Sequence, residues 1–418
     1  MNKFLIGFLI FCFYFQSIAQ NSDSSATRDA ALNLYIDCDD CDMLYLRQNF
    51  TIVNYVRDRL VADVHIIVTE MDNGGGGDEL TFQFIGRNKF AAMVDTLVVN
   101  TKADINESEL RKLILTTIER GLAPFILKTK FAEKISISYN LEKEVKDVVD
   151  PWRNWVFEID LSTYLNGQQS YKSLNMWSSI SASRITEKIK HYTSLNQSYD
   201  ESKYRIYDGN DSLIYSLDVY RNSARFYHIT VWSLGDHWGA GLEGNMWTST
   251  YSNTNFAWDV MPAIEYNLFK YKEASQRQLR MSYAAGYSYL YYVDTTIYNK
   301  IEEGLFYHKF TTQYKQIVKW GNVEASIYYK NYLKDFSLYS LGASISTEIR
   351  LFKGLSLSLY GNSSLPRNQV GLVRDQASTE DVLLQQHELK TQFSYYLSVG
   401  LSYTFGSIYN NVVNPRLD

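Results

Sequence analysis

The last long apolar segment of the chain, residues 393–405, has the sequence FSYYLSVGLSYTF, and its two alternating faces differ sharply. One face carries mostly aromatic and aliphatic side chains, whereas the other is made largely of serine, glycine and threonine. Such a split over about ten residues is typical of a strand whose outer side meets lipid and whose inner side lines a polar lumen. The segment therefore predicts a transmembrane β-strand.

The same alternation recurs upstream. Candidate strands lie at 153–164, 172–185, 188–198, 213–232, 239–250, 255–268, 278–292, 304–318, 322–333, 338–351, 355–363 and 388–405. We therefore predict a transmembrane antiparallel β-barrel of about 12 strands, an even number as in single-chain bacterial barrels. The connections near 187, 234–236, 273, 319–322 and 352–354 fall on one side, opposite longer stretches such as 199–212 and 364–387. This asymmetry predicts that the shorter turns and both ends of the barrel face the periplasm.

Composition supports this division of the chain. Aromatic residues make up 15% of the sequence, and all 8 Trp lie beyond residue 150. Tyr and Trp favour the headgroup zone of a membrane, where a ring is half dry and half wet. A soluble β-sandwich with one wet face is the alternative, but a polar face rich in Ser and Gly favours the barrel. The net charge of −5, without a basic run, gives nucleic-acid binding no electrostatic support.

The N-terminus predicts secretion. Met1-Asn2-Lys3 is followed by an apolar run over residues 4–15 and by Ser17-Ile18-Ala19, the order of a cleavable signal peptide. We expect residues 1–19 to be this signal, and Cys12 to be removed with it. The mature chain then comprises a periplasmic α/β domain over residues 20–150 and an outer-membrane β-barrel over residues 151–418.

Residues 31–140 predict a small α/β unit. Strand candidates lie at 32–36, 64–69, 80–85 and 90–99, and a helix carrying Leu46, Phe50, Val53 and Tyr55 is expected between the first two. A second helix begins at Asn106, with Glu109 completing a capping box. This order of elements resembles the N-terminal periplasmic α/β domain of TolB-like proteins.

Two local motifs in this unit have alternative interpretations. Cys38 and Cys41 form a CxxC pair that predicts a local disulfide in an oxidising compartment. A zinc site lacks further ligands nearby, and a redox role is disfavoured because flanking Asp residues raise a thiol pKa. The run Gly74–Gly77 predicts a flexible hairpin loop. A phosphate loop is disfavoured because the run lacks the GxxxxGK[ST] pattern and joins two strands.

The end of the last strand carries a second signal. Ser398, Gly400, Tyr403 and Phe405 resemble the C-terminal segment by which outer-membrane proteins are recognised by the barrel-assembly machinery, although a tail from Gly406 follows. With its leader domain and Asn-rich tail, the chain resembles Bacteroidota-type outer-membrane β-barrel proteins. The resemblance implies an outer-membrane location with the N-terminal domain in the periplasm, but it brings no activity with it.

Catalytic patterns are sparse. The 6 His show no HxxxH or HExxH spacing, so we expect no metal site and no cofactor. Some barrels of about 12 strands are phospholipases that use a serine and a histidine, and His228 and Thr230 alternate on one strand. No serine–histidine pair stands out, so we expect no enzyme. An outer-membrane hydrolase acting on lipid or ester substrates remains the alternative.

Charged residues on the polar faces are candidates for a lumen. They are Glu158, Asp160, Glu243, Asp259, Glu265, Arg280, Lys309, Lys315, Glu324, Lys330, Glu348 and Arg350. Such charges either select solutes along a polar path or pair across a narrow lumen and close it. The sequence thus favours a role in envelope transport, as a pore or channel, or as a membrane-anchored binding module. Outer-membrane lipid and a periplasmic protein are the expected partners.

Overall fold

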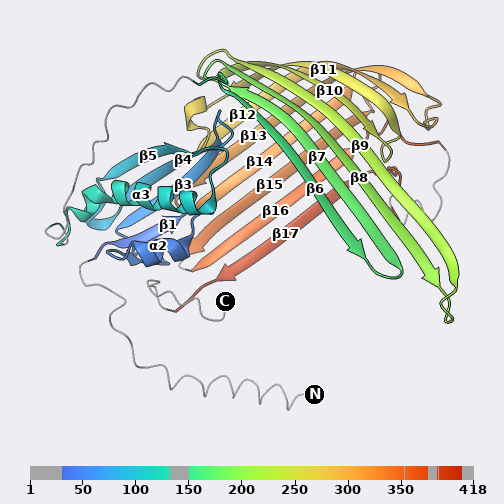
Figure 1. The fold of residues 1–418 in the computed structure, drawn as a ribbon. Coiled ribbons are helices and arrows are strands. Elements are labelled where there is room, and N and C mark those ends of the chain that lie inside the picture. Colours follow the sequence, from blue (N-terminus) through green and yellow to red (C-terminus); the bar gives the residue numbers. More distant parts are fainter. Residues whose placement is uncertain are drawn as a thin grey trace.

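The computed structural model describes residues 31–130, 132, 150–352, 354–374, 384 and 386–406, as an α/β domain followed by a large antiparallel sheet (Figure 1). The predicted signal peptide at 1–19, with Cys12, lies outside the described residues, as do residues 133–149 between the two parts. Within the described part, no helix has both the length and the hydropathy needed to span a membrane.

The N-terminal domain is a five-stranded sheet with its two main helices on one face. Its elements are β1 (Asn33–Asp37), α2 (Met43–Asn49), β2 (Asn54–Tyr55), β3 (Val64–Asp72), β4 (Asp78–Gly86), the 3-10 turn η2 (Asn88–Phe90), β5 (Val94–Asn100) and α3 (Glu107–Ile126). The strand order is β2-β1-β3-β4-β5. β1 runs parallel to β2 and β3, whereas β3, β4 and β5 are antiparallel.

Two expected boundaries in this domain are wrong. The first helix ends at Asn49, and Tyr55 lies in the short strand β2, because residues 54 and 55 pair with Asn33 and Leu34 of β1. The strand expected from residue 90 begins at Val94, since residues 88–90 form the 3-10 turn. The expected start of the second helix is confirmed: the Asn106 side chain accepts a hydrogen bond from the Glu109 backbone N–H.

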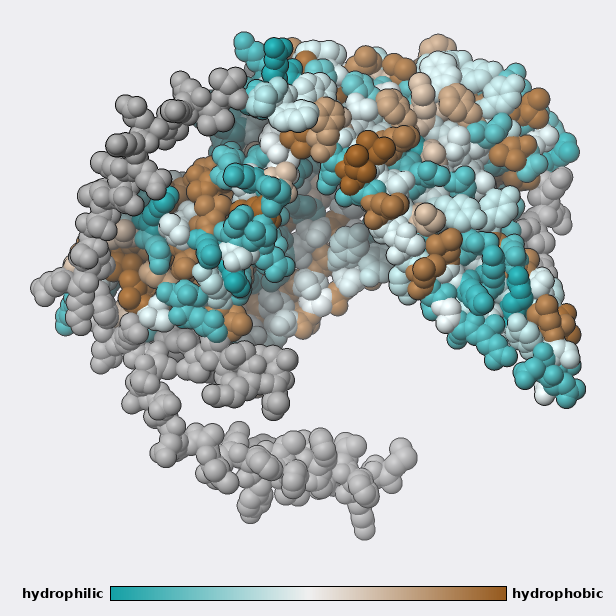
Figure 2. All heavy atoms as spheres, viewed as in Figure 1, coloured by the Kyte–Doolittle hydropathy of each residue, from teal (hydrophilic) through white to brown (hydrophobic). Residues whose placement is uncertain are grey.

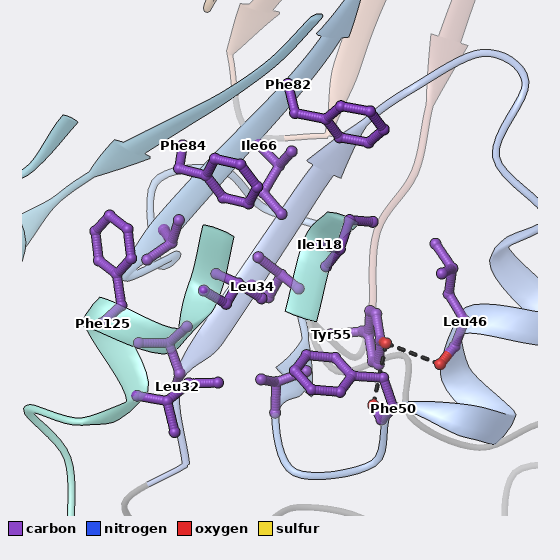
Figure 3. Close-up of a cluster of buried hydrophobic side chains, with 14 of the residues drawn as sticks. Leu32, Leu34, Leu46, Phe50, Tyr55, Ile66, Phe82, Phe84, Ile118 and Phe125 are labelled. Carbon is purple, nitrogen blue, oxygen red and sulfur yellow. Dashed lines mark hydrogen bonds between the residues drawn. The ribbon is translucent and has the colours of Figure 1, made fainter. Parts of the chain in front are cut away.

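The core of the domain lies between the helices and one face of the sheet (Figure 3). Alternate strand residues such as Leu34, Ile66 and Phe84 point toward Ile118 and Phe125 of α3. Tyr55 is also buried there, and its hydroxyl donates to the backbone carbonyl of Leu46 at 2.9 Å. Because strand side chains alternate, the residues between these point to the opposite face of the sheet.

The second part of the chain forms a 12-stranded antiparallel sheet, which confirms the predicted fold class. Its strands are β6 (Trp155–Gly167), β7 (Tyr171–Ile185), β8 (Ile189–Tyr207), β9 (Leu213–Ser233), β10 (Trp238–Ser249), β11 (Thr254–Asn267), β12 (Arg277–Tyr292), β13 (Glu302–Val318), β14 (Gly321–Tyr332), β15 (Tyr339–Phe352), β16 (Leu355–Pro366) and β17 (Ser394–Tyr403). Each strand pairs with its neighbour in sequence, so the sheet is a continuous meander.

Two of the expected connections are shorter than predicted or shifted. The long stretch 199–212 is mostly strand, because β8 and β9 stay paired to the contact between Tyr207 and Leu213. The chain then turns at Asp208, whose carboxylate accepts from the backbone N–H groups of Asn210 and Ser212 at 2.8 Å. The last strand begins at Ser394 and not at 388.

The sheet is strongly curved, and its two edges are β6 and β17 (Figure 1). No hydrogen-bonded pairing joins these two strands within the described residues. The outward surface of both edges is apolar: Ile159 on β6 is 78% exposed, and Leu401 on β17 is 70% exposed. Figure 2 shows further apolar side chains spread over the visible surface of the sheet. We call the surface that carries Ile159 and Leu401 the outer face, and the opposite surface the inner face.

Candidate functional site

The inner face carries the charged residues that the alternation pattern singled out. Directly paired residues on neighbouring strands share a face. The pairings Glu158–Ser181, Asn245–Asp259 and Lys315–Glu324 therefore link the inward positions across the sheet. By the same register the inner face also holds Asp160, Glu243, Glu265, Arg280, Lys309, Lys330, Glu348 and Arg350.

Several of these charges pair between adjacent strands at the end of the sheet nearest the α/β domain, which we call the domain end. Arg280 Nε lies 3.4 Å from Glu265, which also accepts a 2.7 Å hydrogen bond from the Tyr271 hydroxyl. Lys315 and Glu324 lie 3.2 Å apart. In the described part, Glu158, Asp160, Lys309 and Glu348 join no ion pair. The inner face is therefore charged without being fully neutralised by its own residues.

Farther from the domain end, part of the inner face is filled. Asp259 is buried and accepts a 2.8 Å hydrogen bond from Asn245, which in turn accepts from Arg225 Nε at 3.1 Å. Lys330 lies over the Tyr307 ring, with its Nζ 4.0 Å from the ring centroid. Buried apolar residues surround this cluster, namely Leu290, Tyr292, Leu305, Tyr307 and Tyr332. Strand alternation also places Arg225 on this face, although it was not among the expected lumen residues. The inward tyrosines were missed because only charged residues were assigned to the lumen.

A polar hollow lies at the opposite end of the inner face. Its volume is about 400 Å³, and it is lined by Asp200, Arg221, Asn222, Ser223, Ser249 and Tyr251. Its wall includes residue 200, which belongs to the part of β8 that was expected to be a loop. No pattern in the sequence therefore predicted this hollow.

The α/β domain is held to the domain end by an ion pair. Both terminal nitrogens of Arg350, near the end of β15, donate to the two carboxylate oxygens of Asp37, the last residue of β1. One of these hydrogen bonds is 2.5 Å long, and both side chains are about one-fifth exposed. Arg350 was expected to face the lumen, but its partner in the α/β domain could not be inferred from strand alternation.

Further contacts extend this interface over the short turns. Arg59 donates to the backbone carbonyl of Lys319, in the β13–β14 turn, and Gln83 donates to Gln276 at 3.1 Å. Gly74 approaches the end of β7 so closely that a Cβ atom there would lie 2.7 Å from the Ile185 carbonyl oxygen. The β3–β4 hairpin loop is therefore a packed contact, and glycine is needed in it for this approach.

The backbone amides of Gly75, Gly76 and Gly77 are hydrogen-bonded within the loop and are not free for an anion. The Asn73 side-chain oxygen accepts hydrogen bonds from the backbone N–H groups of Gly75, at 2.8 Å, and Gly77, at 3.2 Å. Asn73 Nδ2 donates to the Thr101 carbonyl at 2.9 Å. The loop is thus organised by its own asparagine.

His65 lies beneath the ion pair and is fully buried. Its Nε2 is 3.6 Å from Asp37, and its ring meets the edge of Tyr35 with centroids 4.9 Å apart. Burial lowers the pKa of His65 below its ordinary value despite the nearby carboxylate. Burial alone would raise the pKa of Asp37, but His65 and Arg350 outweigh it and lower this pKa. The interface therefore favours a charged Asp37 beside a neutral His65.

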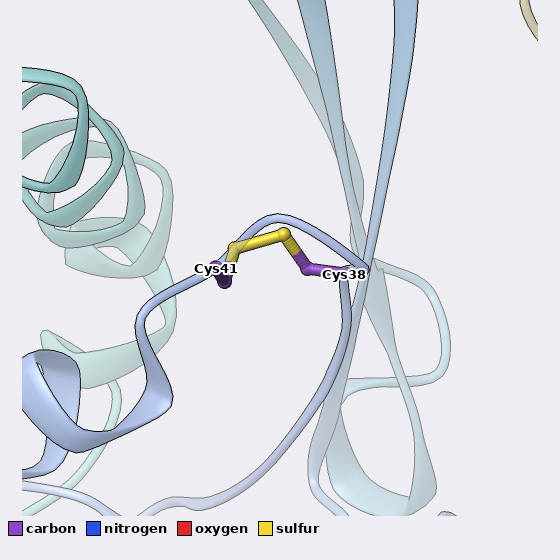
Figure 4. The surroundings of a disulfide bond; sticks show 2 residues. All are labelled: Cys38 and Cys41. Atoms are coloured by element: carbon purple, nitrogen blue, oxygen red, sulfur yellow. A yellow bond between two sulfur atoms is a disulfide. The ribbon is translucent and has the colours of Figure 1, made fainter. Parts of the chain in front are cut away.

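The two remaining groups of predicted residues lie apart from this interface or at its margin. Cys38 and Cys41 form a disulfide in the loop that follows Asp37, with Cα atoms 5.5 Å apart (Figure 4). Ser398, Gly400 and Tyr403 belong to the edge strand β17, and Phe405 follows it with its ring stacked on that of Tyr403. The tail beyond Gly406 lies outside the described residues.

The histidines do not converge on a metal site. No group of three His, Cys, Asp or Glu side chains within the described residues is close enough to hold an ion. His228 hydrogen-bonds to Thr193 at 2.7 Å and to Thr230 at 3.0 Å, on the outer face of the sheet. In the described residues, the hydroxyl groups hydrogen-bonded to the rings of His191 and His228 belong to threonines and not to a serine.

Comparisons with known proteins add little to this geometry. No protein-family model matches the chain, and no curated protein sequence matches it. Among solved structures, the translocator domain of autotransporter NalP from Neisseria meningitidis is similar over 60% of this chain and 82% of that chain, with 10% identity and a TM-score of 0.20. A likeness of this strength carries no argument about function.

Proposed function

We propose that the chain is an outer-membrane β-barrel protein in which the polar inner face provides a path for a solute and the α/β domain covers the periplasmic end. The observation that carries this proposal is the docking of the α/β domain, through Asp37 and Arg350, onto the end of a sheet whose outer face is apolar. A soluble protein rarely exposes so much contiguous apolar surface. The hydrocarbon core of a membrane is the environment in which such an apolar outer face is stable.

Aromatic residues at both ends of the outer face support membrane insertion. Trp238 and Tyr266 pack together at the domain end, with ring centroids 4.8 Å apart. Trp258 contacts Tyr287 and Tyr289 toward the far end. Tyr266 and Trp258 both lie on β11, about 26 Å apart along the strand at roughly 3.3 Å per residue. This spacing suits the two aromatic girdles that flank the apolar band of a membrane barrel.

Insertion implies that the sheet closes on itself. In hydrocarbon, each unpaired backbone N–H or carbonyl costs several kcal/mol, so an open edge is not tolerated there. We therefore propose that β6 and β17 pair in the membrane. In that arrangement the short turns and the α/β domain face the periplasm, and β17, with Ser398, Gly400, Tyr403 and Phe405, is the segment offered to the barrel-assembly machinery.

A membrane-anchored binding module is the second candidate, and the filling of the inner face favours it. The cluster around Tyr307, Tyr332 and Lys330 occupies part of the space that a wide channel would need. In this version the α/β domain, which resembles that of TolB-like proteins, binds a periplasmic protein. A catalytic role has less support. Thr193 and His228 lie in regular ladders whose backbone N–H groups are already paired, so no free amides form an oxyanion hole.

Two experiments test the proposal in sequence. The first is migration of the membrane-extracted protein on a detergent gel with and without boiling. A faster unboiled band supports a closed barrel, whereas identical migration of a protein recovered from the soluble periplasm refutes it. The second is conductance in planar bilayers, with wild type compared with Arg350→Gln. Larger currents through the variant support a solute path covered by the α/β domain. A barrel that inserts and never conducts in either form eliminates the pore and favours the binding module.

A further inference from the structure

Four polar side chains form a continuous hydrogen-bonded chain on the otherwise apolar outer face. Thr193 Oγ1 and His228 Nδ1 lie 2.7 Å apart, His228 Nε2 and Thr230 Oγ1 lie 3.0 Å apart, and Thr230 Oγ1 and His191 Nδ1 lie 2.8 Å apart. These hydrogen bonds join β8 to β9 close to the domain end, since β8 begins at Ile189.

These side chains share their face with exposed apolar residues. Leu195, two positions after Thr193, is directly paired with Phe226, two positions before His228, and both are exposed. Side chains two positions apart on a strand point to the same side. The chain therefore faces outward and not into the lumen.

The four hydrogen-bonded side chains leave one ring nitrogen, Nε2 of His191, for an outside partner. A neutral imidazole donates from one nitrogen and accepts at the other, and a hydroxyl donates once. When Thr193 donates to His228 Nδ1, His228 Nε2 donates to Thr230, and Thr230 donates to His191 Nδ1. The hydrogen of the His191 ring is then on Nε2, which makes none of these three hydrogen bonds. When both ring nitrogens of His191 carry a hydrogen, donation runs in the opposite direction, from His191 Nδ1 toward Thr193, and Nε2 is still a donor. In these two states His191 Nε2 is an N–H group without a partner among the described residues, whereas the reversed order with a neutral His191 leaves Nε2 as an unpaired acceptor.

A guanidinium group lies beside this donor. Arg184 on β7 is the direct cross-strand partner of both His191 and Trp155. Its Nε donates to the Arg153 carbonyl at 3.0 Å, whereas its terminal nitrogens have no hydrogen-bond partner in the described part of the chain. The Trp155 ring stacks on His191, with an interplanar angle of 12°. Two donor groups and an exposed indole therefore meet at one place on the outer rim.

We propose that Arg184 and His191 bind the phosphate group of a phospholipid in the leaflet nearest the α/β domain. This inference rests on the proposed function, because it requires the outer face to meet lipid. An unpaired cation on a lipid-facing surface is costly, and a phosphate diester supplies one negative charge with oxygens that accept from both guanidinium and imidazole. Indole rings favour the headgroup level, and exposed Trp152, Trp155 and Trp232 lie at this end of the sheet.

Charges around the site favour an anion. Three cations lie at this rim, Arg153, Arg184 and Lys188, against two carboxylates. These are Glu187 in the β7–β8 turn and Asp150, whose carboxylate already accepts from the backbone N–H groups of Trp152 and Asn154. Thr193, His228 and Thr230 do not contact the headgroup in this proposal. They position His191, because they fix its ring and hold its Nδ1 in a hydrogen bond.

Native mass spectrometry of the full-length, detergent-solubilised protein tests the site. The probes are phosphatidylglycerol, a diacylglycerol of the same acyl chains, and inorganic phosphate. We expect wild type to retain one phosphatidylglycerol, and the double variant Arg184→Gln/His191→Gln to retain it roughly tenfold less. The matched control is Lys190→Gln, which removes a cation next to His191 but on the inner face, and which should retain the lipid as wild type does.

Each other outcome overturns the inference in an identifiable way. Equal retention of diacylglycerol means that the phosphate is not recognised, and full displacement by inorganic phosphate means that the site takes the free ion and not a headgroup. Equal retention by the double variant and wild type also refutes it. The same samples are run with and without boiling: a normal heat shift confines such a failure to this site, whereas loss of the shift in wild type overturns the proposed function itself.

Discussion

Asp37 and Arg350 are separated by 313 residues in sequence, yet the carboxylate of the first accepts hydrogen bonds from both terminal nitrogens of the second. The pair joins the last residue of β1 to the domain end of β15. A guanidinium and a carboxylate in this geometry form a strong and directional contact. Together with the contacts of Arg59, Gln83 and Gly74, it holds the α/β domain on the sheet. Four predictions concern this interface, the α/β domain and the large sheet.

Arg350→Gln should release the α/β domain from the sheet. The variant leaves the partly buried Asp37 without its cation, and we expect docking to weaken by roughly 2–4 kcal/mol. Limited proteolysis of the membrane-inserted protein measures this as faster cleavage before residue 150. Arg277→Gln is the matched control, because Arg277 pairs with Glu273 at the same end without contacting the domain. Equal cleavage of Arg350→Gln and wild type would contradict the prediction.

Docking should weaken in mild acid. Burial lowers the pKa of His65, so the folded interface holds this ring neutral, and its contribution is lost as pH falls below the ordinary value of about 6.5. The lowered pKa of Asp37 adds a second loss only at lower pH, below about 4. Arg350, Arg59, Arg87 and Tyr35 also surround these groups.

Proteolysis at a series of pH values measures this effect. His65→Phe should abolish the loss of docking that begins below about pH 6.5, because the histidine is the group expected to titrate there. The loss below about pH 4, which depends on Asp37, should remain. A pH profile for this variant that matches wild type would show that another group controls docking.

Phe84→Ala should unfold the α/β domain locally. The ring is fully buried between the sheet and α3, and truncation of a buried phenylalanine costs about 3–5 kcal/mol. Hydrogen exchange of the full-length protein should show loss of protection in β4 and α3, with the strands of the large sheet unchanged. Val98→Ala on β5 removes an exposed side chain and serves as the control. Full protection of α3 in Phe84→Ala would argue against this core.

Cysteine cross-linking tests whether β6 and β17 pair and close the sheet. Ile159→Cys on β6 should form a disulfide with one of Leu397→Cys, Val399→Cys or Leu401→Cys on β17 in membranes. Ile345→Cys on β15 is the control, because β16 and β17 both lie between β15 and β6 in a closed sheet and a cross-link to β6 cannot form. If no β17 position cross-links, the edges pair with something other than each other.

Sequence alternation predicted the large sheet well because each strand has one apolar and one polar face, and this period of two is a local property. It failed where local and tertiary signals differ. β2 forms only because Asn54 and Tyr55 pair with β1. β8 continues to Tyr207 only because it pairs with β9 over that length.

The candidate site was predicted only in part. Alternation assigns Arg350 and Lys330 to a face, since that assignment needs only their position on a strand. It says nothing of what lies opposite, so the Asp37 partner and the packing of Lys330 on Tyr307 could not be predicted. The outward chain from Thr193 to His191 was also missed, because two of its four members look like ordinary strand threonines.

The meander of the large sheet also determines how the protein can assemble. Every strand from β7 onward joins the one made just before it, so the loop entropy lost at each step is only that of a connection between consecutive strands. Such local order favours rapid, sequential growth. Two events are different: the proposed pairing of β6 with β17, and the contact of Asp37 with Arg350. Both must wait until almost the whole chain has been delivered, and they are the steps at which a slow phase or a need for assistance should appear.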